Sequence, residues 1–160
     1  MGSKSSSSSS SAPSNYRTAS AFPSSARLGR VWVSLRRIAC IFGSPNHWAV
    51  IIDVIGFGFI NVQFGDDYLI ISYHPTMADA ARATRGCKIC DIRTSCYDRA
   101  RVGLTVGDLN DYVARLERGR YDEYCFFFND CQNFARSVVD WLNGKYVGPG
   151  PIENGPDFHY

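Results

Sequence analysis

The first half of the chain has a pattern of apolar and polar positions that predicts β-structure. Val31, Val33 and Leu35 recur at every second position, as in a strand with one buried face. The segment that begins at His47 is almost continuously apolar, which is typical of a central strand buried on both faces. Strands are expected over residues 31–38, 47–52, 59–64 and 68–73. Glycine-containing turns separate them, so the pattern predicts an antiparallel meander.

The second half predicts helices. Thr76 is placed to cap a short helix that runs to Ala83. Apolar residues then return at helical spacing over 107–118 and again over 131–142. Residues 86–102 follow neither pattern and are expected to be irregular. Strands followed by helices predict an α+β fold.

Composition divides the chain into three parts. Residues 1–27 form a serine-rich tail that is expected to be disordered, because it has too few apolar side chains to offset the entropy lost on ordering. Residues 28–146 are expected to form one domain, and residues 147–160, rich in glycine and proline, a loose extension. No run approaches the roughly 20 apolar residues of a spanning helix. No apolar signal segment is visible, which favours a cytoplasmic protein.

The leading segment has two features that bear on partners. Its glycine at position 2 and serine at position 6 fit the N-myristoylation pattern, with Gly2 as the acceptor. Residues 1–52 contain six basic residues and no acidic residue, whereas the remainder contains 11 basic and 15 acidic residues. One acyl chain beside a basic segment predicts peripheral association with an anionic membrane. The alternative is a solvated tail; nucleic acid is not expected, because no helix is basic in character.

Cys131 is the candidate nucleophile. Asn129 and Asp130 are good N-cap residues, and either one places Cys131 in the first turn of the last helix. The positive end of the helix dipole favours the thiolate, which is the reactive form. Cys131 also lies on the apolar stripe of this helix, where a cysteine is ordinarily an inert core residue. A suitable base nearby would favour the reactive interpretation.

His47 is the candidate base, because it stands where a turn meets the buried strand. A thiolate–imidazole pair usually needs a third group that fixes the tautomer and orientation of the ring. Strand pairing around residues 56–58 places Gln63 opposite the start of the histidine strand, so Gln63 is the leading candidate. His74 and Asn61 are the alternatives.

The six cysteines of a cytoplasmic chain are expected to be thiols or ligands rather than disulfides. Cys87 and Cys90 have the spacing of one half of a structural zinc site. Cys96 and Cys125 do not form a second close pair, and no histidine is near. The sequence therefore predicts ordinary thiols here, with no metal and no cofactor.

Two short segments resemble a known superfamily. Residues 47–52, His-Trp-Ala-Val-Ile-Ile, are similar to the His-Trp-Ala strand of the lecithin–retinol acyltransferase family. Residues 129–134, Asn-Asp-Cys-Gln-Asn-Phe, are similar to the nucleophile segment of that family and closer still to the Asn-Cys-x-x-Phe segment of the PPPDE peptidases. Both families belong to the circularly permuted, NlpC-type branch of the papain-like fold. The histidine strand precedes the cysteine helix there, as it does in residues 30–145 of this chain.

The resemblance implies a cysteine hydrolase in which Cys131 is the nucleophile, His47 is the general base, and Trp48, Asn129 and Asp130 line the binding site. The implied reaction is cleavage of an amide, isopeptide or thioester bond by a PPPDE-like cysteine peptidase. The substrate would be a protein or a lipid that carries an acyl or amide bond.

The chain also departs from the acyltransferase pattern. Phe59 stands where that family has a second histidine, which moves the third role to Gln63. The C-terminal membrane anchor of that family is not visible. A lipid acyltransferase or phospholipase remains one alternative, and a catalytically inactive binding module with the same fold is another.

Overall fold

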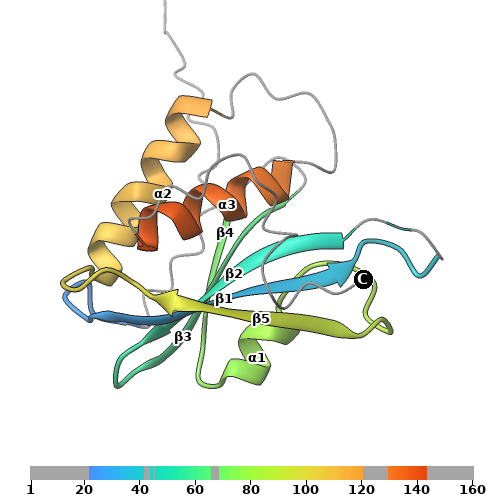
Figure 1. Ribbon diagram of the computed structural model, residues 1–160, viewed down its shortest axis with the longest axis horizontal. Helices are drawn as coiled ribbons and strands as arrows, with labels where there is room; N and C mark the ends of the chain where they lie inside the picture. The colour runs from blue at the N-terminus through green and yellow to red at the C-terminus, as the bar shows by residue number, and fades with distance from the viewer. Residues whose placement is uncertain (1–21, 42–43, 45, 66–68, 121–129, 144–160) are drawn as a thin grey trace, which may run out of the picture.

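The computed structural model describes residues 22–41, 44, 46–65, 69–120 and 130–143 (Figure 1). The elements in chain order are β1 (Leu28–Arg37), β2 (Asn46–Val54), β3 (Gly58–Phe64), β4 (Leu69–His74), α1 (Met77–Arg82), β5 (Ile92–Arg99), α2 (Val106–Arg120) and α3 (Asp130–Asn143). The α+β class predicted from the sequence is confirmed.

The strands form one antiparallel sheet in the order β4-β3-β2-β1-β5. The predicted meander is confirmed, and β2 is the middle strand. Residues 48–52 of β2 are at most 1% exposed, because both faces of this strand are covered. The turn between β2 and β3 closes at Val54 and Gly58, and the pairing then brings Ala49 opposite Gln63.

The fifth strand is a correction to the sequence prediction. Residues 86–102 were expected to be irregular, yet Ile92–Arg99 forms β5 and pairs along β1. Its residues are mostly polar and show no apolar alternation. An edge strand gains its backbone hydrogen bonds from the neighbouring strand and does not need a two-sided apolar pattern. The local sequence pattern was therefore not sufficient to predict β5.

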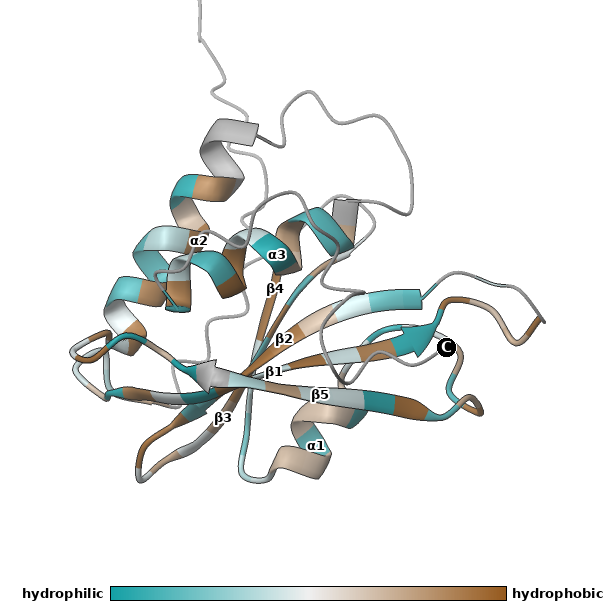
Figure 2. Cartoon of the chain, viewed as in Figure 1, coloured by the Kyte–Doolittle hydropathy of each residue, from teal (hydrophilic) through white to brown (hydrophobic). Residues whose placement is uncertain are grey.

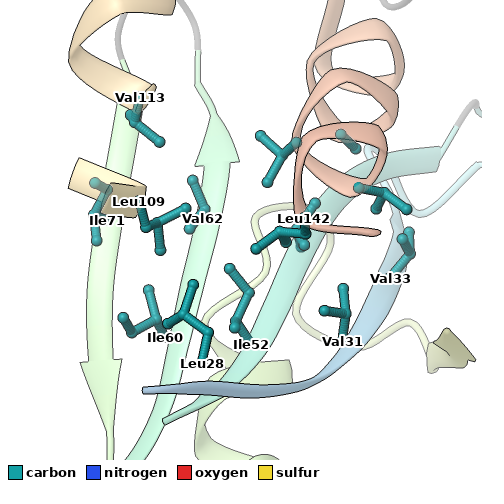
Figure 3. Packing of buried hydrophobic residues seen from close by; sticks show 14 of the residues in the cluster. Leu28, Val31, Val33, Ile52, Ile60, Val62, Ile71, Leu109, Val113 and Leu142 are labelled. Atoms are coloured by element: carbon teal, nitrogen blue, oxygen red, sulfur yellow. The ribbon is translucent and has the colours of Figure 1, made fainter. Parts of the chain in front are cut away.

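The helices lie on both faces of the sheet (Figure 1). We call the face covered by α2 and α3 the α3 face, and the face covered by α1 the α1 face. The main hydrophobic core lies on the α3 face, where strand residues such as Val31, Ile52 and Val62 meet Leu109 of α2 and Leu142 of α3 (Figure 3). Apolar residues concentrate along the central strands, whereas α2 and α3 alternate hydrophilic and hydrophobic positions, as amphipathic helices do (Figure 2).

Local sequence accounts for the helix positions. Thr76 caps α1, since its side chain accepts a hydrogen bond from the backbone N–H of Asp79, as predicted. The predicted helix over 107–118 is α2, and the predicted last helix is α3. Tyr112 of α2 stacks on Trp141 of α3 with ring centroids 4.4 Å apart, which joins the two helices. No helix in the described ranges is long and apolar enough to cross a membrane.

The N-terminal boundary of the domain differs from the expected one. The tail was expected to extend to residue 27, but the ring of Phe22 packs edge-on against Tyr73 at 5.1 Å, and Ala26 is buried. Arg27 also forms an isolated bridge with Thr105. The packed domain therefore includes residues 22–27, while residues 1–21 lie outside the described part of the chain.

Candidate functional site

His47 and Gln63 lie side by side on the α1 face. His47 Nε2 is 3.0 Å from Gln63 Oε1, and both side chains are buried. Their strands are neighbours, and Gln63 is paired with Ala49, two residues beyond His47 on the same side of β2. The spatial proximity expected from the tight turn and strand alternation is therefore present. The catalytic role assigned to the two residues stays a prediction.

The backbone around Gln63 fixes the direction of this hydrogen bond. Gln63 Nε2 donates to the carbonyl of Ala83 at 2.9 Å, and Gln63 Oε1 accepts from the backbone N–H of Arg85 at 2.9 Å. A flipped amide would place donor against donor and acceptor against acceptor. Gln63 Oε1 is thus an acceptor toward the imidazole, and His47 donates through a protonated Nε2. In the neutral ring, Nδ1 is then the basic nitrogen.

The pair belongs to a buried polar network that ties the sheet to α1 and to the segment after it. Of the seven buried polar or charged residues in the described ranges, six lie on this face: Ser34, Arg36, His47, Asn61, Gln63 and Thr84. Thr84 Oγ1 donates to Ser34 Oγ at 2.9 Å, and Arg36 donates to the carbonyl of Thr84 at 3.0 Å. Buried polar groups cost free energy unless they are hydrogen-bonded, so this network specifies how α1 sits on the sheet.

The two alternative orienting residues do not contact His47. Asn61 Nδ2 donates to the carbonyl of Ala80 at 2.8 Å and thereby anchors α1. His74 lies at the far end of β4, opposite Phe59, and its Nε2 is 2.8 Å from Ser72 Oγ. Burial lowers the pKa of His74 below its ordinary value, and the nearby charge of Asp79 opposes this shift.

Cys131 lies in the first turn of α3, as predicted, and is 6% exposed. It belongs to the hydrophobic core of the α3 face, together with Trp48 and Phe134. The helix packs on β2 and β3. Arg136, farther along α3, stands over the Trp48 ring at 5.6 Å from the ring centroid. Trp48, expected in a binding site, is 1% exposed and acts as a core residue in this arrangement.

The structure does not bring Cys131 and His47 together. Successive side chains of a strand point to opposite faces, so His47 and Trp48 face away from each other. Trp48 packs in the core that contains Cys131, whereas His47 bonds to Gln63 on the α1 face. The sheet therefore separates the thiol from the imidazole. The expected thiolate–imidazole contact is absent from this conformation of the described residues.

Some predicted site positions fall outside the described part of the chain. Gly2, Asn129 and Cys125 are among the residues that the structure does not describe. Asp130 is the first residue of α3.

A shallow hollow of about 350 Å³ lies at the other end of the α1 face, and only residues of the strands and their adjoining turns line it. Trp32 and Phe59 contact each other there at 5.9 Å between ring centroids. Arg30, Asp53 and Arg99 add charged groups to its lining, and Gly29 and Ile55 complete it. Burial raises the pKa of the Asp53 carboxyl, although the Arg30 backbone and the charge of Arg99 oppose the rise. Sequence reasoning missed this hollow, since its residues come from four separate segments.

The cysteines correct another expectation. Cys40 and Cys87 form a disulfide with Cα atoms 5.6 Å apart, although thiols or ligands were expected. Cys90 and Cys96 are free thiols. The two bridged cysteines are 47 positions apart in the sequence, so their proximity follows from the fold and not from local spacing.

No family model, no curated protein and no solved structure matches the chain.

Proposed function

We propose that this domain is a ligand-binding module on a permuted papain-like scaffold, in which Cys131 has a structural role. The observation that supports this proposal is the separation of Cys131 and His47 by the sheet. A nucleophile and its base need to be within hydrogen-bond reach, about 2.6–3.2 Å. A cysteine packed among apolar side chains is ordinarily inert.

The hollow on the α1 face is the binding surface in this proposal. Two aromatic rings, Trp32 and Phe59, offer apolar contact area. Arg30 and Arg99 outnumber the one carboxylate of the lining, Asp53, so the charged groups of the hollow are positive on balance. Arginine beside aromatic rings suits a carboxylate ligand that also carries an apolar group. The proposed occupant is therefore an acidic peptide segment that contains an aromatic or aliphatic residue.

Thiol reactivity tests the structural role of Cys131. The folded protein is treated with iodoacetamide, and labelling of each cysteine is followed by peptide mass spectrometry. Cys96, exposed on β5, should be labelled well before Cys131. The His47→Ala variant should leave the labelling rate of Cys131 unchanged. Rapid labelling of Cys131 that disappears in His47→Ala would overturn the binding-module proposal.

Peptide binding tests the surface. An array of acidic peptides with and without aromatic residues is probed with the wild type and with Arg30→Gln and Arg99→Gln. Both variants should lose binding, whereas Arg115→Gln, an exposed position on α2, should retain it. Equal binding by all of these proteins would exclude the hollow as the site.

The second candidate function is the thiol hydrolase that the sequence resemblance implies. The hydrogen bond between His47 and Gln63 favours it, because an oriented imidazole is what a general base requires. In this reaction the Cys131 thiolate attacks an amide, isopeptide or thioester carbonyl, and His47 protonates the leaving group. Amides at the start of α3 would hold the oxyanion. The start of β2 would have to turn His47 to the α3 face.

Activity-based labelling separates the two candidates. If the protein is a hydrolase, an electrophilic acyl probe should label Cys131 in the wild type. The probe should label neither Cys131→Ala nor His47→Ala. Ubiquitin-like conjugates and phospholipid vesicles then distinguish a peptidase from a lipid enzyme. Peripheral membrane association through myristoylated Gly2 remains a separate proposal, which mass spectrometry of the N-terminal peptide tests directly.

A further inference from the structure

Three cysteines from two distant segments meet at one end of the sheet. The Sγ atoms of Cys40, Cys87 and Cys90 all lie within 4.8 Å of one another. We call these three residues the sulfur cluster. Cys40 follows β1, whereas Cys87 and Cys90 lie between α1 and β5. Only one pair in the cluster is bridged, so Cys90 stands beside the Cys40–Cys87 disulfide as a free thiol.

The backbone holds the two segments in place independently of the sulfur atoms. The N–H of Cys87 donates to the carbonyl of Arg37, the last residue of β1, at 2.7 Å. The N–H of Cys90 donates to the carbonyl of Cys87 at 3.2 Å and closes a turn in which the two Sγ atoms lie within 4.8 Å of each other. Gly86 permits this approach, because its φ is 132° and an added Cβ would lie 2.5 Å from the Arg37 oxygen.

We propose that the sulfur cluster, when reduced, is a Zn²⁺ site with three thiolate ligands. Zinc–thiolate bonds of about 2.3 Å place tetrahedral sulfur ligands about 3.8 Å apart. The three Sγ atoms, all within 4.8 Å of one another, are close enough to adopt this spacing once the disulfide is reduced. A Cys-x-x-Cys turn supplies two ligands at the usual spacing, and Cys40 supplies the third. Among the described residues no fourth cysteine, histidine or carboxylate joins the group.

The basic residues close in sequence to the cluster suit the negative charge of a zinc–thiolate centre. Three thiolates and one Zn²⁺ carry a net charge of −1, and Arg37, Arg85 and Lys88 are close in sequence to the ligands. Asp91 is the only acidic residue in the segment 84–93. Positive side chains this close in sequence would offset the negative charge of the zinc–thiolate centre.

The disulfide and the zinc site are two states of the same cluster. A dithiol reductant transfers two electrons and two protons to the Cys40–Cys87 bond and is itself oxidised to a disulfide. The three thiols then release three protons as they bind Zn²⁺. This inference does not depend on either proposed function, because no residue of the cluster belongs to the buried polar network or to the hollow.

Metal titration of the reduced full chain tests the inference. The protein is reduced with a phosphine, and Zn²⁺ binding is measured by chelator competition, with Co²⁺ as a spectroscopic probe for thiolate ligation. One ion per chain is expected, with thiolate-to-cobalt charge transfer. Cys90→Ser should weaken binding by at least about tenfold. This variant retains the Cys40–Cys87 pair, and circular dichroism of its oxidised form verifies the fold.

Cys96→Ser is the matched control, because Cys96 is a free thiol on β5 outside the cluster. This variant should bind Zn²⁺ with the affinity of the wild type. Cys40→Ser and Cys87→Ser should bind Zn²⁺ as weakly as Cys90→Ser. Absence of binding to the reduced wild type would overturn the inference. Equal affinity of Cys90→Ser and the wild type would overturn it as well.

Discussion

His47 donates from Nε2 to Gln63 Oε1 at 3.0 Å, and this contact lies on the side of the sheet that faces α1. The same glutamine bonds to the backbone at Ala83 and Arg85, so it links β3 both to the imidazole and to the chain beyond α1. A buried side chain with three hydrogen-bond partners is expected to matter for stability as well as for the state of the ring.

Replacing Gln63 by leucine should therefore destabilise the domain. The Ala83 carbonyl loses its donor and the Arg85 N–H loses its acceptor, at a cost of about 2–4 kcal/mol in the free energy of unfolding. Urea denaturation followed by circular dichroism measures the change. Gln132→Leu on α3 is the matched control and should change stability by less than about 0.5 kcal/mol. Equal losses in the two variants would contradict the role given to Gln63.

Thr84→Val tests the other half of the buried polar network. Valine keeps the shape of threonine but removes the hydroxyl that donates to Ser34 and accepts from Asn61. We expect a loss of about 1–2 kcal/mol in the free energy of unfolding. Thr94→Val, at an exposed position of β5, offers the same substitution without the network. The prediction fails if Thr84→Val unfolds at the same denaturant concentration as the wild type.

Gly86→Ala should destabilise the domain more than Gly103→Ala does. Both glycines have positive φ, 132° and 95°, so both substitutions strain the backbone by roughly 1–2 kcal/mol. An added Cβ meets nothing within 4 Å at Gly103, whereas at Gly86 it would lie 2.5 Å from the Arg37 oxygen. Thermal unfolding of the two variants isolates this backbone contact. A Tm for Gly86→Ala as high as that for Gly103→Ala would show that the segment can move away from β1.

The environment of His74 should make the free energy of unfolding depend on pH. Burial lowers its pKa in the folded protein, so the unfolded chain takes up a proton first as the pH falls. The His74 contribution to stability is therefore present above the ordinary pKa of 6.5 and decreases as the pH falls through it toward the folded value. Denaturation at pH 7.5 and pH 5.5 should show a smaller acid loss in His74→Gln than in the wild type. An identical loss in both proteins would mean that His74 does not contribute.

Most strands and helices could be predicted from the sequence, because the period-two and helical patterns of apolar residues are local. The alternation in β1, the apolar run of β2 and the tight turn before β3 led directly to the meander and to the proximity of His47 and Gln63. Their register depends only on turn length and side-chain alternation. Thr76 likewise determined where α1 begins, since a cap acts within one turn.

The tertiary structure alone decided which face each helix covers, and this decided the site. Cys131 at the start of a helix and His47 at the start of a strand are both visible in the sequence, but no local pattern states whether α3 packs on the side of His47 or of Trp48. Packing of the apolar stripe of α3 against Trp48 selected the second arrangement. The pairing of β5 with β1 and the meeting of Cys40 with Cys87 and Cys90 are also long-range contacts. They depend on the assembled sheet, because residues that are far apart in the chain become neighbours only when the strands between them have paired.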